Sequence, residues 1–439
     1  RDHRDLHLSL RRQRQMCKTD RVREITLQAN KGVYGLGDAP RLWRERFHEW
    51  MMKRGFTQSR YDECFYFMKL FKGSRVNKLL VTMHVDDCEV AGCPSDLAWF
   101  KKALVAEFGE VKQQQWDFRH CGIEYHQSAD LKEITHSQKQ FVDAMEYYPM
   151  GKARSREKQS PLDASEATGY RSVLGGLQWA SHTRSDHSAE CSRLQGKRGS
   201  PTVEDMRDAN SLLRRCKDTA SSAYLSFRKQ SAAPKRILVF PDASLNSVSK
   251  KDKNGNKTEQ KRTQAGWLIL LTDDTETLDT DNAHVLNWVT RKVTRVSKST
   301  LASEAVARTG AVEDAIRIAG WLEELNSTTL DTKTLIVCQE QGGFSIPIDV
   351  ATDAKALHEV IISPIVPRPS DPGSLLWLKW LRECHQYKVL RKALWTSTGD
   401  MLGDGLTKDK DNEELRQLFR AGVIKTKYAT MSLSLIHIS

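Results

Sequence analysis

The sequence lacks the cysteine pairs that disulfide-rich and zinc-binding proteins use. Its 439 residues include nine cysteines, an odd number, and no Cys-x-x-Cys pair. Cys88 and Cys93 are close in sequence, but no second Cys or His pair follows at zinc-finger spacing. We therefore expect reduced thiols in an intracellular protein, without a disulfide framework or a zinc module. The sequence does not distinguish a cytoplasmic from a nuclear location.

Long apolar runs are also missing. No stretch reaches the roughly 18 apolar residues of a membrane-spanning helix, so we expect no membrane partner. The first residues are rich in arginine and contain neither a starting Met nor an apolar segment, which excludes a secretory signal peptide. We interpret residues 1–30 as a basic, truncated N-terminal segment, with a nucleic-acid-binding arm as the alternative. Residues 426–439 continue no pattern, and we expect a non-native or disordered tail.

The sequence combines a large positive net charge with the amino-acid composition of a globular protein. The formal net charge is +12, which favours a polyanionic partner such as nucleic acid, although charge alone does not exclude a merely soluble basic protein. Hydrophobic residues make up 39% of the chain and charged residues 28%, as in proteins with a packed core. The length allows two or three domains.

Leu79–Gly92 is predicted to be a hairpin of two apolar strands, with Asp86 and Asp87 at its tip. Two adjacent carboxylates at the end of an apolar hairpin repel each other, and a divalent cation would relieve that repulsion. Mg²⁺ suits such a site, because it binds carboxylates and completes its shell with water and substrate phosphates. A solvated Asp-Asp turn is the alternative, since short motifs often match by chance.

The stretch Lys31–Phe56 is predicted to be a Gly-rich turn followed by a helix. Pro40 suits the first turn of a helix. Trp43, Phe47 and Trp50 then recur at helical spacing on one apolar face, and Gly55 ends the pattern. Packing of an ordinary core helix would also explain these aromatic residues.

These two stretches together resemble a known family. The hairpin is similar to the catalytic hairpin of reverse transcriptases, aromatic-Val-Asp-Asp, with His84 in the aromatic position. Lys31–Phe56 resembles the YGLKQAPR-x-W segment of copia-type retrotransposons. The resemblance implies that Asp86 and Asp87 are catalytic metal ligands. It also implies that the template and the incoming nucleotide are supported by Tyr34, Gly35, Pro40, Arg41 and His84.

Further stretches continue the resemblance. Phe118–Tyr125 is similar to the family's Leu-Gly-Ile-Glu strand, Ile134–Met145 to its next helix, and Tyr170–Asp186 to its YRS…TRPD segment. We therefore predict a palm-like region at 31–150 and a linker with thumb- or connection-like helices at 151–230. The family's palm has a further Asp on an upstream strand, and nothing before Lys31 matches it. Polymerisation by this chain alone is therefore not expected.

Residues 231–425 show three strand-like stretches, a long helix, and then alternating strands and helices. A basic insertion, Lys250–Arg262, is expected to be a loop within this region. Acidic residues stand at strand ends or at the start of the long helix, where they can converge at one edge of a sheet. They are Asp242, Glu304, Asp353 and Asp404. Four such carboxylates can hold two Mg²⁺ ions for phosphodiester cleavage, whereas any one alone would be an ordinary surface acid.

Each of the four acids lies in a short sequence motif that resembles the ribonuclease H domain of the same family. The stretches are DAS at Asp242, SKSTLASEA at Glu304, TDAKAL at Asp353 and MLGDGLTK at Asp404. The resemblance covers about residues 31–425. It implies that these four acids are catalytic metal ligands.

The sequence thus predicts an α+β or α/β chain: a partial reverse-transcriptase palm and connection followed by a ribonuclease H-like mixed sheet with helices. The expected activity is Mg²⁺-dependent cleavage of the RNA strand of an RNA–DNA hybrid, with Mn²⁺ as the alternative ion. The expected partners are that hybrid, an RNA template, a DNA primer and other segments of the polyprotein. Two other hypotheses remain: a catalytically inactive nucleic-acid-binding remnant, and another two-metal nuclease of integrase-like type.

Overall fold

The computed structural model describes residues 37–72, 75–251, 257–294, 297–327, 331–363, 369, 371–408, 412–426 and 431–432. Tyr34, Gly35, the predicted segment 1–30 and most of the predicted tail lie outside these ranges. The chain divides into two compact units, Arg1–Ala103 and Leu104–Ser439. The domain boundaries expected from the sequence stay predictions.

The first unit begins with helix α2 (Ala39–Lys53). Phe47 and Trp50 of the predicted apolar face are buried, together with Met51, whereas Trp43 is half-buried. Pro40 lies in the first turn, and Asp38 precedes the helix without making a side-chain capping hydrogen bond. Gly55 follows the helix with φ of 86°, a backbone conformation that favours glycine. The predicted helix and its end are therefore confirmed.

An antiparallel sheet completes this unit, in the order β1-β2-β3-β4. Its strands are β1 (Thr57–Gln58), β2 (Phe65–Lys72), β3 (Arg75–His84) and β4 (Asp87–Ala91). Alternate β3 residues, Leu79, Val81 and Met83, are buried, as expected of a strand with one face on a core. Helix α3 (Pro94–Phe108) follows.

The second unit opens with another antiparallel sheet, in the order β5-β6-β7-β8. Its strands are β5 (Asp117–His120), β6 (Ile123–Gln127), β7 (Glu133–Ser137) and β8 (Leu225–Arg228). The prediction of a single helix over Ile134–Met145 is wrong. The first half is strand β7, which pairs with β6 and β8, and only α4 (Lys139–Ala144) is helical. The β-branched Ile134 and Thr135 suit a strand that is paired on both sides.

Three longer helices follow: α5 (Ala164–Ala180), α6 (Ser188–Gln195) and α7 (Val203–Asp218). Both α5 and α7 begin with a capping box, Asp163 with Glu166 and Thr202 with Asp205. The reciprocal hydrogen bonds of such a box satisfy backbone N–H groups that a helix start leaves unpaired. Apolar residues of α5, α6 and α7 share one buried core, in agreement with the predicted helical character of this region.

The last part is a mixed sheet in the order β11-β10-β9-β12-β13-β14. Strands β9 (Lys235–Lys251), β10 (Lys257–Asp273) and β11 (Ala283–Lys292) are antiparallel neighbours. Strand β12 (Ile348–Thr352) pairs in parallel with both β9 and β13 (Leu390–Trp395), and β14 (Met431–Ser432) closes the edge. This is the mixed sheet predicted for the C-terminal region, and the predicted fold class is confirmed.

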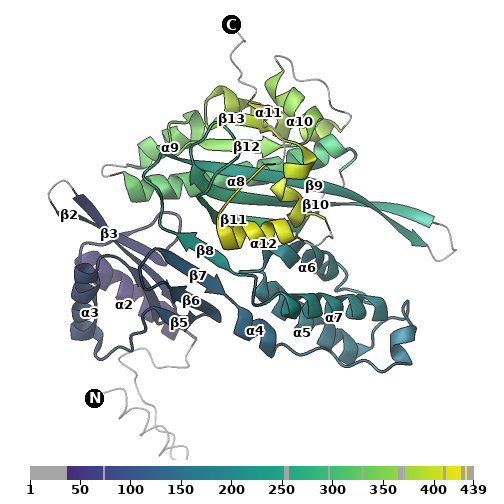
Figure 1. Ribbon diagram of the computed structural model, residues 1–439, viewed down its shortest axis with the longest axis horizontal. Coiled ribbons are helices and arrows are strands. Elements are labelled where there is room, and N and C mark those ends of the chain that lie inside the picture. Colours follow the sequence, from purple (N-terminus) through teal and green to yellow (C-terminus); the bar gives the residue numbers. More distant parts are fainter. Residues whose placement is uncertain are drawn as a thin grey trace, which may run out of the picture. The chain divides into compact units, whose positions relative to one another are not determined.

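Helices cover both faces of this sheet (Figure 1). They are α8 (Thr300–Asn326), α9 (Thr332–Gln341), α10 (Lys355–Ile362), α11 (Leu375–Gln386) and α12 (Glu413–Ala421). Alternation along β9 separates two cores. Ile237 and Val239 pack with residues of α8, α10 and α11, whereas Leu238 and Phe240 pack with residues of α12. The sheet is thus buried on both sides.

The basic insertion predicted as a loop is largely strand. Strands β9 and β10 stay paired without a register shift from Lys235↔Asp273 to Lys251↔Lys257. Strand β9 therefore continues through Asp242 and into the insertion as far as Lys251. Two neighbouring strands that extend beyond the sheet together continue to pair their backbone N–H and C=O groups. This pairing favours an extended two-stranded ribbon over an irregular loop.

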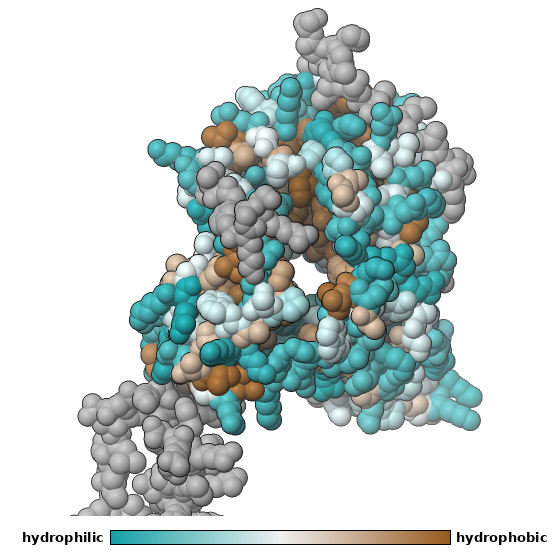
Figure 2. All heavy atoms as spheres, turned by 60° about the vertical axis from the view of Figure 1, so that its left-hand side comes forward, coloured by the Kyte–Doolittle hydropathy of each residue, from teal (hydrophilic) through white to brown (hydrophobic). Residues whose placement is uncertain are grey.

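Hydrophobic side chains lie mostly inside these cores. The face drawn in Figure 2 is largely hydrophilic, with hydrophobic residues gathered in a few separate places. In the part of the chain that the structure describes, no helix is long and apolar enough to cross a bilayer.

Candidate active site

The Asp86–Asp87 hairpin has the geometry predicted for it. His84 pairs with Asp87 across a two-residue turn, and the residues from His84 to Asp87 are exposed. Val85 has φ of 56°, a left-handed conformation that is strained for a β-branched residue. The indole N–H of Trp43 donates to the Val85 carbonyl oxygen at 2.8 Å, which ties helix α2 to the turn. Both carboxylates are therefore presented to solvent on a fixed turn.

The predicted support residues of this unit are only partly described. Pro40 and Arg41 lie in the first turn of α2, and Arg41 forms an exposed ion pair with Glu45 at 2.7 Å. His84 ends strand β3 beside the two acids. Their roles toward a template or a nucleotide stay predictions.

The four acids of the C-terminal sheet occupy the positions that the sequence indicates, with one adjustment. Asp242 lies within the long strand β9 and not at its end. Glu304 lies in the N-terminal part of α8, whose start is capped by Ser299. Asp353 directly follows strand β12. Asp404 lies in the short helix η5 (Leu402–Leu406). Asp242, Glu304 and Asp404 are at least nine-tenths buried.

Two side chains that directly follow η5, Thr407 and Lys408, contact these acids. The Thr407 hydroxyl donates a hydrogen bond to the Asp242 carboxylate. The Lys408 ammonium lies 2.6 Å from the Asp404 carboxylate. Backbone N–H groups of Thr407 and Lys408 both donate to the Asp404 carbonyl oxygen, at 3.2 and 3.0 Å, so one tight turn holds both side chains.

The acids also perturb one another. Burial raises the pKa of Asp242 to about 6, and the charges of Asp404 and Asp353 add to the rise. Burial raises the pKa of Glu304 to about 9, again with contributions from the Asp242 and Asp353 charges. Interactions of this kind require the four carboxylates to lie close together. The structure therefore brings the predicted quartet into one electrostatically coupled group.

Glutamine in place of Glu304 is expected to stabilise the metal-free protein at alkaline pH. Since the pKa of Glu304 in the folded chain is about 9, the folded chain holds a proton that the unfolded chain releases near pH 4.5. The stability of the wild-type chain should therefore fall as pH rises from about 4.5 to 9. Thermal melts in chelator should give Glu304→Gln a Tm on the order of 5 °C higher at pH 8. Equal slopes of Tm against pH between 6.5 and 9 would contradict the buried, protonated carboxyl.

Glycines allow η5 to approach the sheet closely. A Cβ on Gly403 would lie 2.8 Å from the Phe240 carbonyl oxygen and 3.1 Å from Asp242 Cβ. A Cβ on Gly266 of β10 would lie 2.7 Å from Leu406 Cβ. Real Cβ atoms essentially never come closer than 3.0 Å to such neighbours, so the close approach of η5 to the sheet depends on these two glycines.

Alanine at Gly403 should therefore lower the free energy of unfolding by about 1–3 kcal/mol, as overpacking does in a close-packed interior. Denaturant melts would measure the loss. Gly175→Ala provides the matched control, because nothing lies within 4 Å of a Cβ at this position of helix α5. That control should leave stability unchanged or raise it by up to ~1 kcal/mol. Equal effects of the two substitutions would be inconsistent with close η5 packing.

The donor chemistry of the quartet fits a divalent ion, because carboxylate oxygens are the ligands that Mg²⁺ prefers. Within the described residues, however, no group of three or more His, Cys, Asp or Glu side chains surrounds a single point as a metal cage would. Thr407 and Lys408 instead contact two of the carboxylates. The carboxylates that could bind a metal ion are therefore present. In this structure two of them are hydrogen-bonded or ion-paired to side chains of the protein itself.

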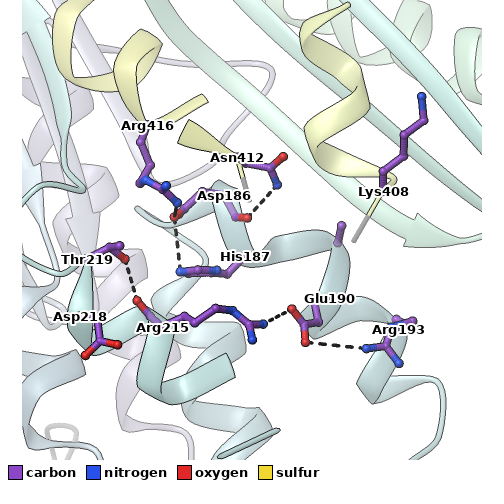
Figure 3. Close-up of a pocket in the computed structure, with 11 residues that line it drawn as sticks. Asp186, His187, Glu190, Arg193, Arg215, Asp218, Thr219, Lys408, Asn412 and Arg416 are labelled. Carbon is purple, nitrogen blue, oxygen red and sulfur yellow. Dashed lines mark hydrogen bonds and ion pairs between the residues drawn. The ribbon is translucent and has the colours of Figure 1, made fainter. Parts of the chain in front are cut away.

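A second polar cluster, which the sequence did not reveal, joins the helices of residues 151–230 to the C-terminal sheet. Arg184 Nε donates to Asp186 Oδ1 at 3.0 Å, and Arg416 Nη1 donates to Asp186 Oδ2 at 3.1 Å. Asn412 Nδ2 donates to the Asp186 carbonyl oxygen at 2.9 Å (Figure 3). These four residues, named here the Asp186 cluster, are all at most 5% exposed. They fix α12 against the preceding helices.

A cavity of about 510 Å³ lies beside the Asp186 cluster, lined partly by His187, Glu190, Arg215 and Lys408 (Figure 3). Burial lowers the pKa of His187 to about 4, so its ring is neutral at pH 7. The Arg215 guanidinium pairs with the Glu190 carboxylate. Cations and acids of this cavity largely neutralise each other, and we assign it no catalytic role.

Comparison with known proteins agrees with the resemblance seen in the sequence. Residues 12–153 match the family described as reverse transcriptase (RNA-dependent DNA polymerase). The chain is 22% identical to the retrovirus-related Pol polyprotein from transposon RE1 of Arabidopsis thaliana, over 86% of this chain and 24% of that protein. It is 20% identical to the corresponding polyprotein from transposon TNT 1-94 of Nicotiana tabacum, over 88% of this chain and 28% of that protein.

Two further matches are a yeast protein and a solved structure. A putative transposon Ty5-1 protein of Saccharomyces cerevisiae is 23% identical over 49% of this chain and 72% of its own. The crystal structure of LC11-RNase H1 in complex with an RNA/DNA hybrid aligns with 41% of this chain and 99% of its own, at 11% identity and a TM-score of 0.25. The chain spans about a quarter of the length of the two plant polyproteins. The predicted resemblance to Pol polyproteins of copia-type retrotransposons is confirmed.

Proposed function

We propose that the chain cleaves the RNA strand of an RNA–DNA hybrid, in a Mg²⁺-dependent reaction at Asp242, Glu304, Asp353 and Asp404. One observation carries this proposal: acids from strand β9, helix α8, the end of β12 and η5 form a single, largely buried and charge-coupled group. Such a concentration of carboxylates is costly unless cations bind it. The similarity to retrotransposon Pol polyproteins supports the same activity.

In this proposal the four carboxylates hold the metal, with Mn²⁺ as an alternative to Mg²⁺. When bound, a pair of such ions activates water and stabilises the leaving oxygen of a phosphodiester. Asp242 and Glu304 bind protons readily in the metal-free chain, because their pKa values are about 6 and 9. Metal binding therefore displaces protons from these two side chains. The buried sheet behind them fixes the positions of the carboxylates.

The partner in this proposal is a nucleic-acid duplex. The net charge of +12 favours binding of phosphates, and a hybrid would be held mainly through its backbone and its A-form shape. The RNA template and DNA primer belong to the palm-like part of the chain, where Asp86 and Asp87 stand exposed on their turn. We do not extend the proposal to polymerisation, which needs a further acid for a two-metal site.

A nucleic-acid-binding remnant without catalysis is the second candidate. One observation favours it: Lys408 and Thr407 already contact two of the four acids. Hybrid binding that is indifferent to Mg²⁺, with no cleavage, would support this candidate.

An assay with the label on either strand tests the proposed function. The full chain is incubated with Mg²⁺ and an RNA–DNA hybrid labelled on the RNA in one sample and on the DNA in another. We expect RNA fragments and intact DNA. Cleavage of the DNA strand, or of neither strand by a folded protein, would overturn the proposal.

A further inference from the structure

Among the described residues, Lys408 forms an ion pair with one acid of the quartet. Its ammonium nitrogen lies 2.6 Å from Asp404 Oδ2, while the Asp404 side chain is only 6% exposed. Lys408 itself retains 41% of its side-chain exposure, so its end can reach either the acids or solvent. In Figure 3 the side chain points away from Asp186 and Asn412, although Lys408 also lines their cavity. The residue therefore faces the quartet, not the Asp186 cluster.

The charge of Lys408 acts on more than Asp404. The positive charge of Lys408 lowers the pKa of both Asp242 and Glu304, against the larger effect of burial. In return, Asp404, Asp242 and Asp353 raise the pKa of Lys408, although its partial burial works in the opposite direction. One ammonium thus partly neutralises the charges of Asp404, Asp242 and Asp353, which is the electrostatic role that a bound cation would have.

The local backbone holds Lys408 in place while leaving its end adjustable. The Lys408 N–H donates to the Asp404 carbonyl oxygen at 3.0 Å, which fixes the start of the side chain. Beyond that point lies a flexible four-carbon stem with a compact charge. Thr407, on the same turn, donates to Asp242. The turn after η5 therefore supplies a tethered cation to the buried acids.

We propose that Lys408 is a positioning residue, an internal counter-ion that holds the carboxylates together without metal and gives up Asp404 when a divalent ion binds. This inference rests on the proposed metal site. Two opposing effects follow from it. Lys408 stabilises the metal-free fold, and it competes with Mg²⁺ for Asp404, so that loss of its charge should strengthen Mg²⁺ binding.

The test is a Mg²⁺ titration of the full chain followed by thermal melting and calorimetry, with no substrate present. Lys408→Gln should lower the Tm in chelator and reduce the Mg²⁺ concentration for half-saturation about tenfold, the usual size of such effects around a metal site. Lys408→Arg should increase that concentration, because a guanidinium pairs with a carboxylate through two hydrogen bonds. Lys425→Gln is the control, since this exposed lysine pairs with exposed Asp281 at 2.9 Å in the same unit. It should change neither quantity.

The outcomes separate this inference from the function on which it rests. If Mg²⁺ fails to stabilise the wild-type chain, both the metal site and the role of Lys408 are wrong. If Mg²⁺ stabilises the wild type but the order of half-saturation is not Gln below Lys below Arg, only the role of Lys408 is overturned. Should Lys408→Gln fail to fold, the comparison of wild type with Lys408→Arg still decides, because a purely structural lysine predicts no weaker Mg²⁺ binding in the arginine variant.

Discussion

Asparagine in place of Asp242 is expected to reduce Mg²⁺-dependent cleavage of an RNA–DNA hybrid by at least ~100-fold, the scale of losing one preorganised electrostatic contact at a reacting centre. Asp242 lies at the centre of the quartet: its charge raises the pKa of Glu304, and Asp404 and Asp353 raise its own. Asparagine keeps the size of the side chain and can still accept a hydrogen bond from Thr407. The fold and the binding of hybrid should therefore survive the loss of the charge.

The control for this experiment is Asp281→Asn, an exposed acid of the same unit whose side chain is 79% exposed. Cleavage and hybrid binding are measured for both variants at equal protein concentration. Asp353→Asn should behave like Asp242→Asn, since Asp353 directly follows strand β12 beside β9. Unchanged cleavage in either quartet variant would show that the site lies elsewhere. Loss of hybrid binding together with cleavage would mean that these acids shape the binding surface.

Alanine in place of Asp186 is expected to lower the free energy of unfolding of the Leu104–Ser439 unit by about 3–5 kcal/mol, as removal of one partner from a buried ion pair does. The substitution leaves the guanidiniums of Arg184 and Arg416 buried at 2% and 5% exposure without their shared carboxylate. It does not touch the quartet. Urea or thermal melts give the loss directly.

Asp143→Ala is the matched control, because its ion pair with Lys139 is solvent-exposed on helix α4. Exposed pairs of this kind contribute about 0–1 kcal/mol. A loss as small for Asp186→Ala as for Asp143→Ala would mean that the Asp186 cluster is not held together by its charges.

The Asp186 cluster should also make the stability of the protein sensitive to acid. Burial tends to raise the pKa of Asp186, but His187 in its protonated form, the charge of Arg184 and hydrogen bonds from Arg184 and Arg416 outweigh it and bring the pKa to about 2. Because this value lies below that of the unfolded chain, about 3.9, the resulting stability is complete above pH 4 and is lost as pH falls toward 2. Melts between pH 5 and 2 should show a steeper loss for the wild type than for Asp186→Ala.

Local patterns made much of the fold predictable. Helix α2, the β3–β4 hairpin and α8 each repeat apolar residues at the period of their element, and each appears where the spacing indicates. The order of Asp242, Glu304, Asp353 and Asp404 along strands and a helix start was also enough to predict that they meet. Their proximity follows from sheet topology, because β9 and β12 run parallel.

The features that sequence missed depend on partners far away in the chain. Asp186 and Arg416 are 230 positions apart, and nothing near either residue indicates the other. Residues 134–137 lie in a stretch that resembles a helix of the family, yet they pair with β6 and β8 as a strand. Lys408 was part of a matched motif, but its contact with Asp404 depends on the turn after η5. Contacts between residues far apart in the sequence decide these features, and the local pattern of a single sequence does not reveal such contacts.

The most direct test of the central claim is the cleavage of a labelled RNA–DNA hybrid by the full chain as Mg²⁺ is varied and then removed with chelator. The coupled carboxylates of Asp242, Glu304, Asp353 and Asp404 predict cutting of the RNA strand that rises with Mg²⁺, stops in chelator and returns when Mg²⁺ is restored. Absence of cutting by a folded chain at saturating Mg²⁺, or cutting that continues in chelator, would contradict it.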